Sequence, residues 1–234
     1  MKYKLIIGSI IALFLLPQLA SADVIFPDDA GVINVKDYGA KGDGVTDDTA
    51  AIQKVVSDSL ANIGAGAGTV IVYLPAGTYI VSNTIVPKKD STAQGGWSPY
   101  LTLQGQQRDK TIIKLKDNAP GYSTPKAVLF MASGCFTCHG NVDWTGKAEG
   151  NEGFNNNIFD LTVDTGKGNI GAIGIDYLAS NNGEVRDVKI VSGDGEGYTG
   201  LSMVRKWPGP ALIKNLLIEG FDYGISIAES QYGM

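Results

Sequence analysis

The chain has 234 residues, of which 44% are hydrophobic, and its 24 acidic and 19 basic residues give a formal charge of −5. This acidic balance leaves no basic stripe to neutralise phosphates, so it argues against a nucleic-acid partner and against unaided binding of a polyanion. The length is sufficient for one domain with a sizeable core, despite 31 glycines.

Residues 1–22 predict a secretory signal peptide. They contain a basic start, an almost wholly apolar run over residues 5–19, and the small-residue cleavage sequence Ala20-Ser21-Ala22. We therefore expect a secreted, periplasmic or extracellular protein that begins at Asp23, carries a formal charge of −7 after losing two lysines, and has no membrane contact. The alternative is an uncleaved membrane anchor, but the apolar run is short for that role.

The first part of the mature chain predicts a strand, a glycine-rich turn and a helix. Residues 32–35 (VINV) are strand-like in composition, and the glycines of segment 37–53 mark tight turns. Thr46 or Asp47 is expected to cap the helix that follows. Apolar residues then recur at helical spacing, at Ile52, Val55, Val56, Leu60 and Ile63. This helix is expected to end at Gly64 and to cover the first layer of the fold.

Short strands are expected next, over residues 70–74, 78–81, 85–86, 100–103 and 111–115. Between Asp117 and Asn156 the periodicity disappears and Gly, Pro, Ser and Asn accumulate. We interpret that stretch as a long excursion from the regular structure.

Residues 157–164, 184–191 and 212–219 repeat one another at spacings of 27 and 28 residues. Three columns of equivalent residues result: Asp160, Asp187 and Asn215; Leu161, Val188 and Leu216; Val163, Ile190 and Ile218. A glycine followed by an aliphatic residue recurs later in each repeat, at Gly174-Ile175, Gly200-Leu201 and Gly224-Ile225. Each repeat therefore predicts at least two short strands.

Such a coil cannot bury its apolar face alone, but stacked coils bury their aliphatic columns against one another. The sequence thus predicts an all-β protein, a right-handed parallel β-helix with an N-terminal capping α-helix, over residues 23–234. No polar or helical segment follows the third repeat before Met234. We therefore expect the C-terminal end of this domain to be incomplete.

Segments 37–53 (DYGAKGDGVTDDTAAIQ) and 72–81 (VYLPAGTYIV) resemble the N-terminal motif of the pectate-lyase-like superfamily, which includes polygalacturonase and rhamnogalacturonase relatives. Segments 181–190 (NNGEVRDVKI) and 207–225 (WPGPALIKNLLIEGFDYGI) resemble the family 55 glycoside hydrolases, the exo-β-1,3-glucanase group. The resemblance implies a β-helix that acts on a polysaccharide, although phage tail spikes and adhesive proteins share the first motif.

The resemblance does not carry catalytic residues over to this sequence. The Asn-Thr-Asp, Asp-Asp, Gly-His-Gly and Arg-Ile-Lys segments of polygalacturonases have no match. Pectate lyases need a catalytic arginine beside an acidic calcium cluster, and the sequence places no such cluster beside Arg186 or Arg205. The resemblance to family 55 implies that the catalytic acid lies beyond residue 234, so the catalytic residues stay unassigned. An inactive segment is therefore the alternative to an active enzyme.

Several carboxylates in the repeats are candidates for chemistry. Asp164 and Glu219 occupy one position two repeats apart, a separation that fits the carboxyl pair of an inverting glycosidase. The alternative is that both are solvated turn carboxylates. Asp194 and Glu196 lie in a Gly-rich run and are expected to form a turn, and Asp176 is expected to face outward from a strand.

Aromatic residues near the ends of the repeats are candidates for stacking on sugar rings: Tyr177, Tyr198, Trp207 and Tyr223. Equally, some of them are expected to be packing residues, because aromatic side chains dominate the buried area of most domains.

The segment Cys135-Phe136-Thr137-Cys138-His139 contains both cysteines and the only histidine. The pattern is that of c-type haem attachment, yet its surroundings are loop-like and haem attachment normally comes with a small helical domain. A local disulfide, metal binding and free thiols are the alternatives. No cofactor is expected, with haem at this motif, or calcium in a lyase, as the alternatives.

Together these features predict a secreted polysaccharide-degrading glycoside hydrolase acting on a β-glucan or pectic substrate. A pectate or rhamnogalacturonan lyase is the first alternative. A glycan-binding or structural module, such as an adhesin or a spike-like shaft, is the second. The oligomeric state is not predicted.

Overall fold

The computed structural model describes residues 24–27, 30–61, 70–86, 101–131, 155–179, 182–205 and 208–227, without the side chains of residues 59–61. The signal peptide, the glycines at 64–68 and the segment Cys135–His139 therefore lie outside the described residues. Within the described part, no helix is both long enough and apolar enough to cross a membrane.

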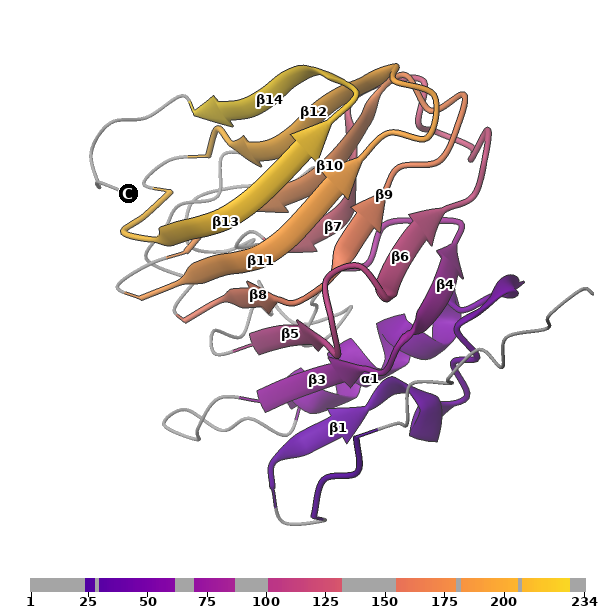
Figure 1. Ribbon diagram of the computed structural model, residues 1–234, viewed down its shortest axis with the longest axis vertical. Helices are drawn as coiled ribbons and strands as arrows, with labels where there is room; N and C mark the ends of the chain where they lie inside the picture. The colour runs from indigo at the N-terminus through magenta and orange to yellow at the C-terminus, as the bar shows by residue number, and fades with distance from the viewer. Residues whose placement is uncertain are drawn as a thin grey trace, which may run out of the picture.

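The described strands form two parallel sheets, which wind as a stack of coils (Figure 1). The larger sheet is bent into two arms. Its first arm contains β1 (Val32–Asn34), β3 (Val70–Leu74), β5 (Leu101–Gly105) and β8 (Asn157–Phe159). Its second arm contains β2 (Asp43–Asp47), β4 (Gly77–Val81), β6 (Thr111–Leu115) and β9 (Thr162–Asp164).

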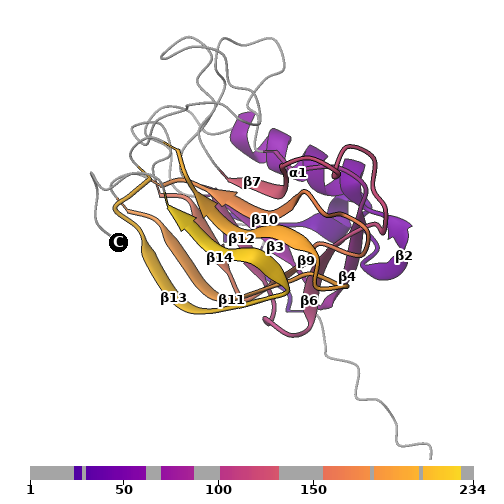
Figure 2. The ribbon, with the colours of Figure 1, turned by 90° about the horizontal axis from the view of Figure 1, so that it is seen from above.

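The two arms are joined in the later coils by continuous strands, β11 (Glu184–Val191) and β13 (Leu212–Glu219). The first half of β11 pairs with β8 and its second half with β9. The smaller sheet, which we call sheet B, contains β7 (Lys126–Met131), β10 (Ala172–Tyr177), β12 (Gly197–Met203) and β14 (Phe221–Ile227). Figure 2 shows sheet B lying across the stack from strands β11 and β13.

The predicted columns are confirmed by the strand register. Val163 pairs with Ile190, which pairs with Ile218 in the next layer, and Val188 pairs with Leu216. Leu161, Val188 and Ile190 are fully buried in one core that runs through the stack. The fold class is confirmed as an all-β parallel β-helix, because all pairings between the described strands are parallel and the aliphatic columns face a shared interior.

The polar column has a backbone explanation. Asp160, Asp187 and Asn215 have φ angles of 56°, 55° and 50°, in the left-handed region. Asn and Asp tolerate this region better than other non-glycine residues. The column therefore marks the corner at which each coil turns from the first arm to the second.

The glycine column is explained by close packing between the two sheets. A Cβ atom on Gly174 would lie 2.3 Å from Cγ2 of Ile190, and one on Gly200 would lie 2.4 Å from Cγ2 of Ile218. Sheet B therefore approaches the aliphatic columns so closely that a side chain does not fit at these positions.

The capping helix is confirmed as α1 (Thr49–Ala61). Ile52, Val55 and Val56 are buried in the same core as the first strands. As predicted for Asp47, its Oδ1 accepts a hydrogen bond from the amide of Thr49, the first residue of the helix, at 3.0 Å. The hydroxyl of Thr46 instead donates to Oδ2 of Asp43. Asp48 accepts from the amides of Lys41 and Gly42 at 2.7 and 3.0 Å, so it ties the glycine turn to the helix.

Three local predictions were wrong. Val35 begins a short 3-10 helix, η1 (Val35–Tyr38), rather than ending a strand. Residues 43–47, interpreted as part of a turn, form β2 and pair with β4. Residues 126–131, placed in the long excursion, form β7, because their apolar side chains complete the layer of sheet B below β10.

Candidate functional site

The outer face of sheet B changes character from one layer to the next. On β7 and β10 it carries buried apolar side chains that form a small cluster of their own, Ala127, Phe130 and Ile173. On β12 and β14 it carries hydroxyl and aromatic side chains. The register aligns Ile173 with Thr199 and Tyr223, and Phe130 with Asp176, Ser202 and Ser226.

The central feature of this face is a buried ion pair between Asp176 on β10 and Arg205, which follows β12. Arg205 donates from Nε to Oδ1 of Asp176 at 3.0 Å and from Nη2 to Oδ2 at 2.6 Å. The side chains are 4% and 2% exposed, respectively. The guanidinium also lies over the ring of Phe130, with 4.6 Å between Cζ and the ring centre.

Burial raises the pKa of Asp176, and the hydrogen bonds and charge of Arg205 oppose that shift. Asp176 was expected to face outward, and it does lie on the outer side of the strand, but it is buried rather than solvated. The sequence showed no acidic residue beside Arg205, because the two partners are 29 residues apart. Because the pair is bidentate and desolvated, it holds the loop after β12 against sheet B.

Two exposed tyrosines lie on the later layers of the same sheet. The rings of Tyr198 on β12 and Tyr223 on β14 meet edge to face, with 5.7 Å between their centres. Tyr198 is 36% exposed and Tyr223 is 55% exposed. They form an aromatic surface that extends over two coils and is open to a ligand.

The other two aromatic candidates differ from this pair. Tyr177 is fully buried, and its hydroxyl donates to the carbonyl oxygen of Asn156 at 2.7 Å. Burial raises the pKa of its hydroxyl. The prediction that Tyr177 stacks on sugar is therefore wrong, since its ring belongs to the core. Trp207 lies outside the described residues.

Asp164 and Glu219 lie on the second arm of the larger sheet, not on sheet B. The register places Val191 directly between them, which confirms that they share a position two coils apart, at a separation of about 9 to 10 Å. Each has a lysine partner: Asp164 Oδ2 lies 3.7 Å from Nζ of Lys114, and Glu219 Oε2 lies 3.1 Å from Nζ of Lys189. This arrangement supports the alternative of surface carboxylates, and a catalytic role for the pair stays a prediction.

Asp194 is a turn residue, as predicted. Its Oδ2 accepts from the amide of Gly168 at 2.6 Å, in the turn one coil below, and its Oδ1 accepts from the amide of Glu196 at 3.2 Å. The hydrogen bond from Gly168 is the main cause that lowers the pKa of Asp194. Asp194 therefore links turns of successive coils.

Arg186 also forms ion pairs with neighbours on its own strand. Its Nε lies 3.0 Å from Glu184 Oε1, and its Nη1 lies 3.9 Å from Asp187 Oδ2. Across the described ranges, no group of three or more His, Cys, Asp or Glu side chains is arranged to hold a metal ion. Cys135, Cys138 and His139, the predicted haem or metal candidates, lie outside those ranges.

This chain belongs to a carbohydrate-active family of parallel β-helix proteins. Residues 32–234 match the family described as rhamnogalacturonase A/epimerase, pectate lyase-like. The match confirms the resemblance of the N-terminal motif to the pectate-lyase-like superfamily, while the finer resemblance to family 55 stays a prediction.

Two curated proteins are similar in sequence to this chain. The chain is 46% identical over 102 residues, 44% of its length, to mannuronan C5-epimerase AlgE3 of Azotobacter vinelandii. It is 27% identical over 206 residues, 85% of its length, to a probable glucan endo-1,3-beta-glucosidase of Arthroderma benhamiae. The matched regions are 5% and 21% of those proteins, so this chain spans only a small part of either.

Among solved structures, the A-module of mannuronan C-5 epimerase AlgE4 of Azotobacter vinelandii superimposes with a TM-score of 0.49 at 23% identity. The superposition covers 83% of this chain and 53% of that module.

Proposed function

We propose that this chain is part of a secreted glycoside hydrolase that acts on a β-glucan, and that the glucan lies along the outer face of sheet B. Two findings support the proposal: family membership, and the similarity over 85% of the chain to a protein named as a probable glucan endo-1,3-beta-glucosidase. Secretion rests on residues 1–22, and N-terminal sequencing of the exported protein should begin at Asp23.

The single observation that carries the proposal is the exposed pair of Tyr198 and Tyr223. Aromatic rings offer sugars an apolar face of matching size. Because the two tyrosines lie on successive coils, they follow the axis of the stack, along which an extended chain would run. Thr199 and Ser202 lie on the same strand as Tyr198, and both residues are buried.

One observation favours a second candidate function, the processing of a uronate polymer. The pectate or rhamnogalacturonan lyase alternative belongs to this class. The similarity to a mannuronan epimerase is higher in identity, but it covers less than half of the chain. The acidic composition opposes unaided binding of a polyanion, so we favour the neutral glucan.

The test is binding and turnover by the exported chain on soluble β-1,3-glucan, polygalacturonate and alginate. We expect binding and release of reducing sugar with the glucan only. The double variant Tyr198→Ala/Tyr223→Ala should weaken glucan binding about tenfold or more, because it removes the whole aromatic surface. Ile170→Ala is the matched control, since Ile170 is an exposed apolar residue that lies on a turn, outside the strands that carry the tyrosines.

Each other outcome has a definite meaning. Glucan binding without turnover would assign the chain to the binding-module alternative. Cleavage of polygalacturonate, with a requirement for added calcium, would assign it to the lyase alternative. Equal glucan binding by the wild type and the double tyrosine variant would refute the site on sheet B.

A further inference from the structure

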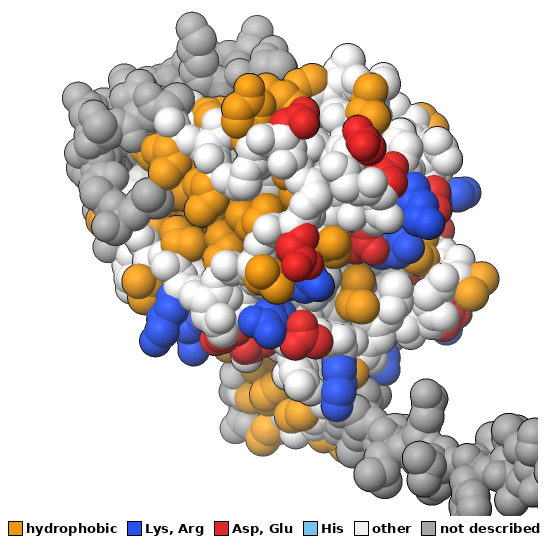
Figure 3. Space-filling view, turned by 45° about the horizontal axis from the view of Figure 1, so that its top comes forward, with side chains coloured by type: hydrophobic (Ala, Val, Ile, Leu, Met, Phe, Trp, Pro, Cys, Tyr) orange, Lys and Arg blue, Asp and Glu red, His pale blue; other side chains and the backbone are white. Residues whose placement is uncertain are grey.

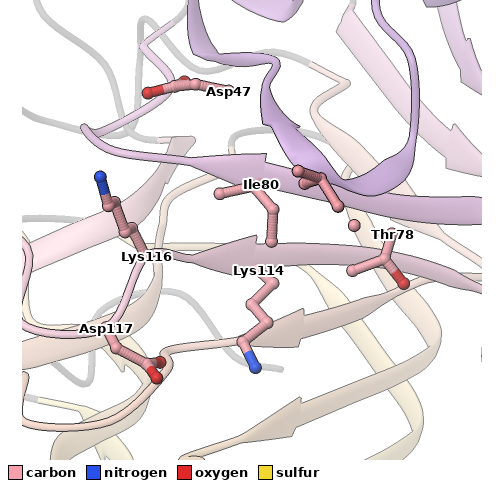
Figure 4. Close-up of a pocket in the computed structure, with 8 residues that line it drawn as sticks. Asp47, Thr78, Ile80, Lys114, Lys116 and Asp117 are labelled. Atoms are coloured by element: carbon pink, nitrogen blue, oxygen red, sulfur yellow. The ribbon is translucent and has the colours of Figure 1, made fainter.

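A hollow lies away from sheet B, on the outer face of the second arm (Figure 4). Its volume is about 440 Å³, within the usual range for a small-molecule site. It is lined by residues of β2, β4 and β6 and of the turn after β6: Gly44, Val45, Asp47, Thr78, Ile80, Lys114, Lys116 and Asp117.

The carboxylates of this hollow are held in place by backbone amides. Oδ1 of Asp47 accepts from the amide of Thr49 at 3.0 Å, and Oδ1 of Asp117 accepts from the amide of Lys167 at 3.0 Å. Each carboxylate has a second oxygen and further lone pairs, which can accept from a ligand. Asp47 and Asp117 therefore offer a ligand two carboxylate acceptors whose positions are already fixed before binding.

Two donors of the hollow, Lys114 and Lys116, come from neighbouring positions on one coil. Lys114 lies 3.7 Å from Asp164, which leaves ammonium hydrogens available. Lys116 forms no ion pair within 4 Å with any residue that the structure describes, and it extends toward Asp47 in Figure 4. Thr78 adds a hydroxyl on the opposite side of Ile80. Donors and acceptors therefore surround an apolar floor.

The floor is formed by Ile80 on β4, with Val45 beside it, and Val45 is 85% exposed. A neutral sugar ring matches such a site. Its C–H face packs on aliphatic groups, and each hydroxyl both donates to a carboxylate and accepts from an ammonium group. A uronate fits less well, because its charge would meet two fixed carboxylates as well as the lysines.

We propose that this hollow is a second glycan-binding site, and that it takes a neutral polysaccharide. The inference rests on the proposed function for its substrate class, and adds a site on a different face of the stack. Figure 3 shows acidic and basic side chains intermingled rather than segregated on the surface it draws, which likewise favours a ligand without net charge.

The experiment is a titration of the ¹⁵N-labelled chain with a hexamer of β-1,3-linked glucose, followed by amide chemical shifts. We expect the amides of Thr78, Lys114 and Lys116 to shift with a dissociation constant of their own. Lys116→Ala should weaken binding at this site about tenfold or more, because it removes one charged hydrogen bond. Lys214→Ala removes an exposed lysine from β13 and is the matched control, which should leave the constant unchanged.

The amides of Thr199 and Ser202 report separately on sheet B. If these shift while the hollow does not, the second site is refuted and the proposed function stands. If no amide on either face shifts with the glucose hexamer, both fail. An unchanged constant in Lys116→Ala, or tighter binding of a galacturonate hexamer to the hollow, would also overturn the proposal of a neutral-sugar site.

Discussion

Asp176 on sheet B and Asp160 at the corner of the larger sheet are carboxylates with opposite surroundings. Burial is the main cause that raises the pKa of both. The hydrogen bonds and positive charge of Arg205 lower the pKa of Asp176 again. At Asp160, the negative charge of Asp187 in the next coil raises the pKa further, and the opposing effect of Arg186 is smaller. Stacking repeats a charge as readily as it repeats an aliphatic side chain, so an acidic column needs a cation or an amide beside it.

The corner column already contains one such solution. Asn215 follows Asp187 in the next coil, and its Nδ2 donates to Oδ1 of Asp187. An amide keeps the left-handed backbone preference of the position and removes the like charge. Sheet B uses the other solution, a cation supplied by the loop after the strand.

The largest effect is expected from Arg205→Ala, which leaves Asp176 buried without its partner. We expect a loss of about 3–5 kcal/mol in the free energy of unfolding, measured by urea denaturation, and a melting temperature lower by roughly 10 °C. The double variant Asp176→Leu/Arg205→Met removes both charges and should recover most of this loss. A double variant as unstable as the single one would show that packing over Phe130, rather than the charge, is what the arginine provides.

An intermediate effect is expected in the glycine column, where one position again differs between coils. Gly174→Ala should destabilise the fold by about 1–3 kcal/mol, because its Cβ would lie 2.3 Å from Cγ2 of Ile190. Gly224→Ala is the matched control, since a Cβ there meets nothing within 4 Å. Thermal unfolding of the two variants measures the difference, and equal melting temperatures would contradict the close approach of the two sheets.

The smallest effect, and one of opposite sign, is expected from Asp160→Asn. Because the pKa of Asp160 is raised in the folded protein, the folded protein retains the carboxyl proton at pH values at which the unfolded chain has lost it. The free energy of unfolding therefore falls as pH rises from the ordinary value of 3.8 to the raised pKa of the folded state. The variant should therefore match the wild type at low pH and exceed it by a few tenths of a kcal/mol near pH 7. Chemical denaturation at both pH values measures this.

Asp194→Asn is the control of opposite sign, because the pKa of Asp194 is lowered in the folded state. Its stabilising effect is present above pH 3.8 and is lost as pH falls through the folded pKa, so this variant should lose stability near pH 7. If both variants respond to pH in the same direction, the contrast between the two carboxylates is wrong.

The last described coil lies at one end of the described residues and shows a different contrast between equivalent positions. Leu201 on β12 is fully buried, while its partner Ile225 on β14 is 48% exposed. Figure 3 shows hydrophobic side chains gathered on this end, and the exposed large apolar residues of the last described coil are Leu212, Leu217, Tyr223, Ile225 and Ile227. A buried column thus requires a layer on both sides of each residue.

The sequence by itself determined the period of the coil, the columns that line its interior and the helix that covers its first layer. These features are local or periodic, so spacing alone reveals them. The sequence did not predict strand β7. Residues 126–131 pair with a strand more than forty residues later and carry no repeat signature of their own.

Only the tertiary structure decided which side chains share a site. It brought Arg205 to Asp176, placed Tyr177 in the core and Tyr198 beside Tyr223, and gave Asp164 and Glu219 their lysine partners. The reason is that the repeat determines only the coil to which a residue belongs. Bulges and turns determine the face on which the side chain lies and the loop that contacts it. Those are set by packing between coils.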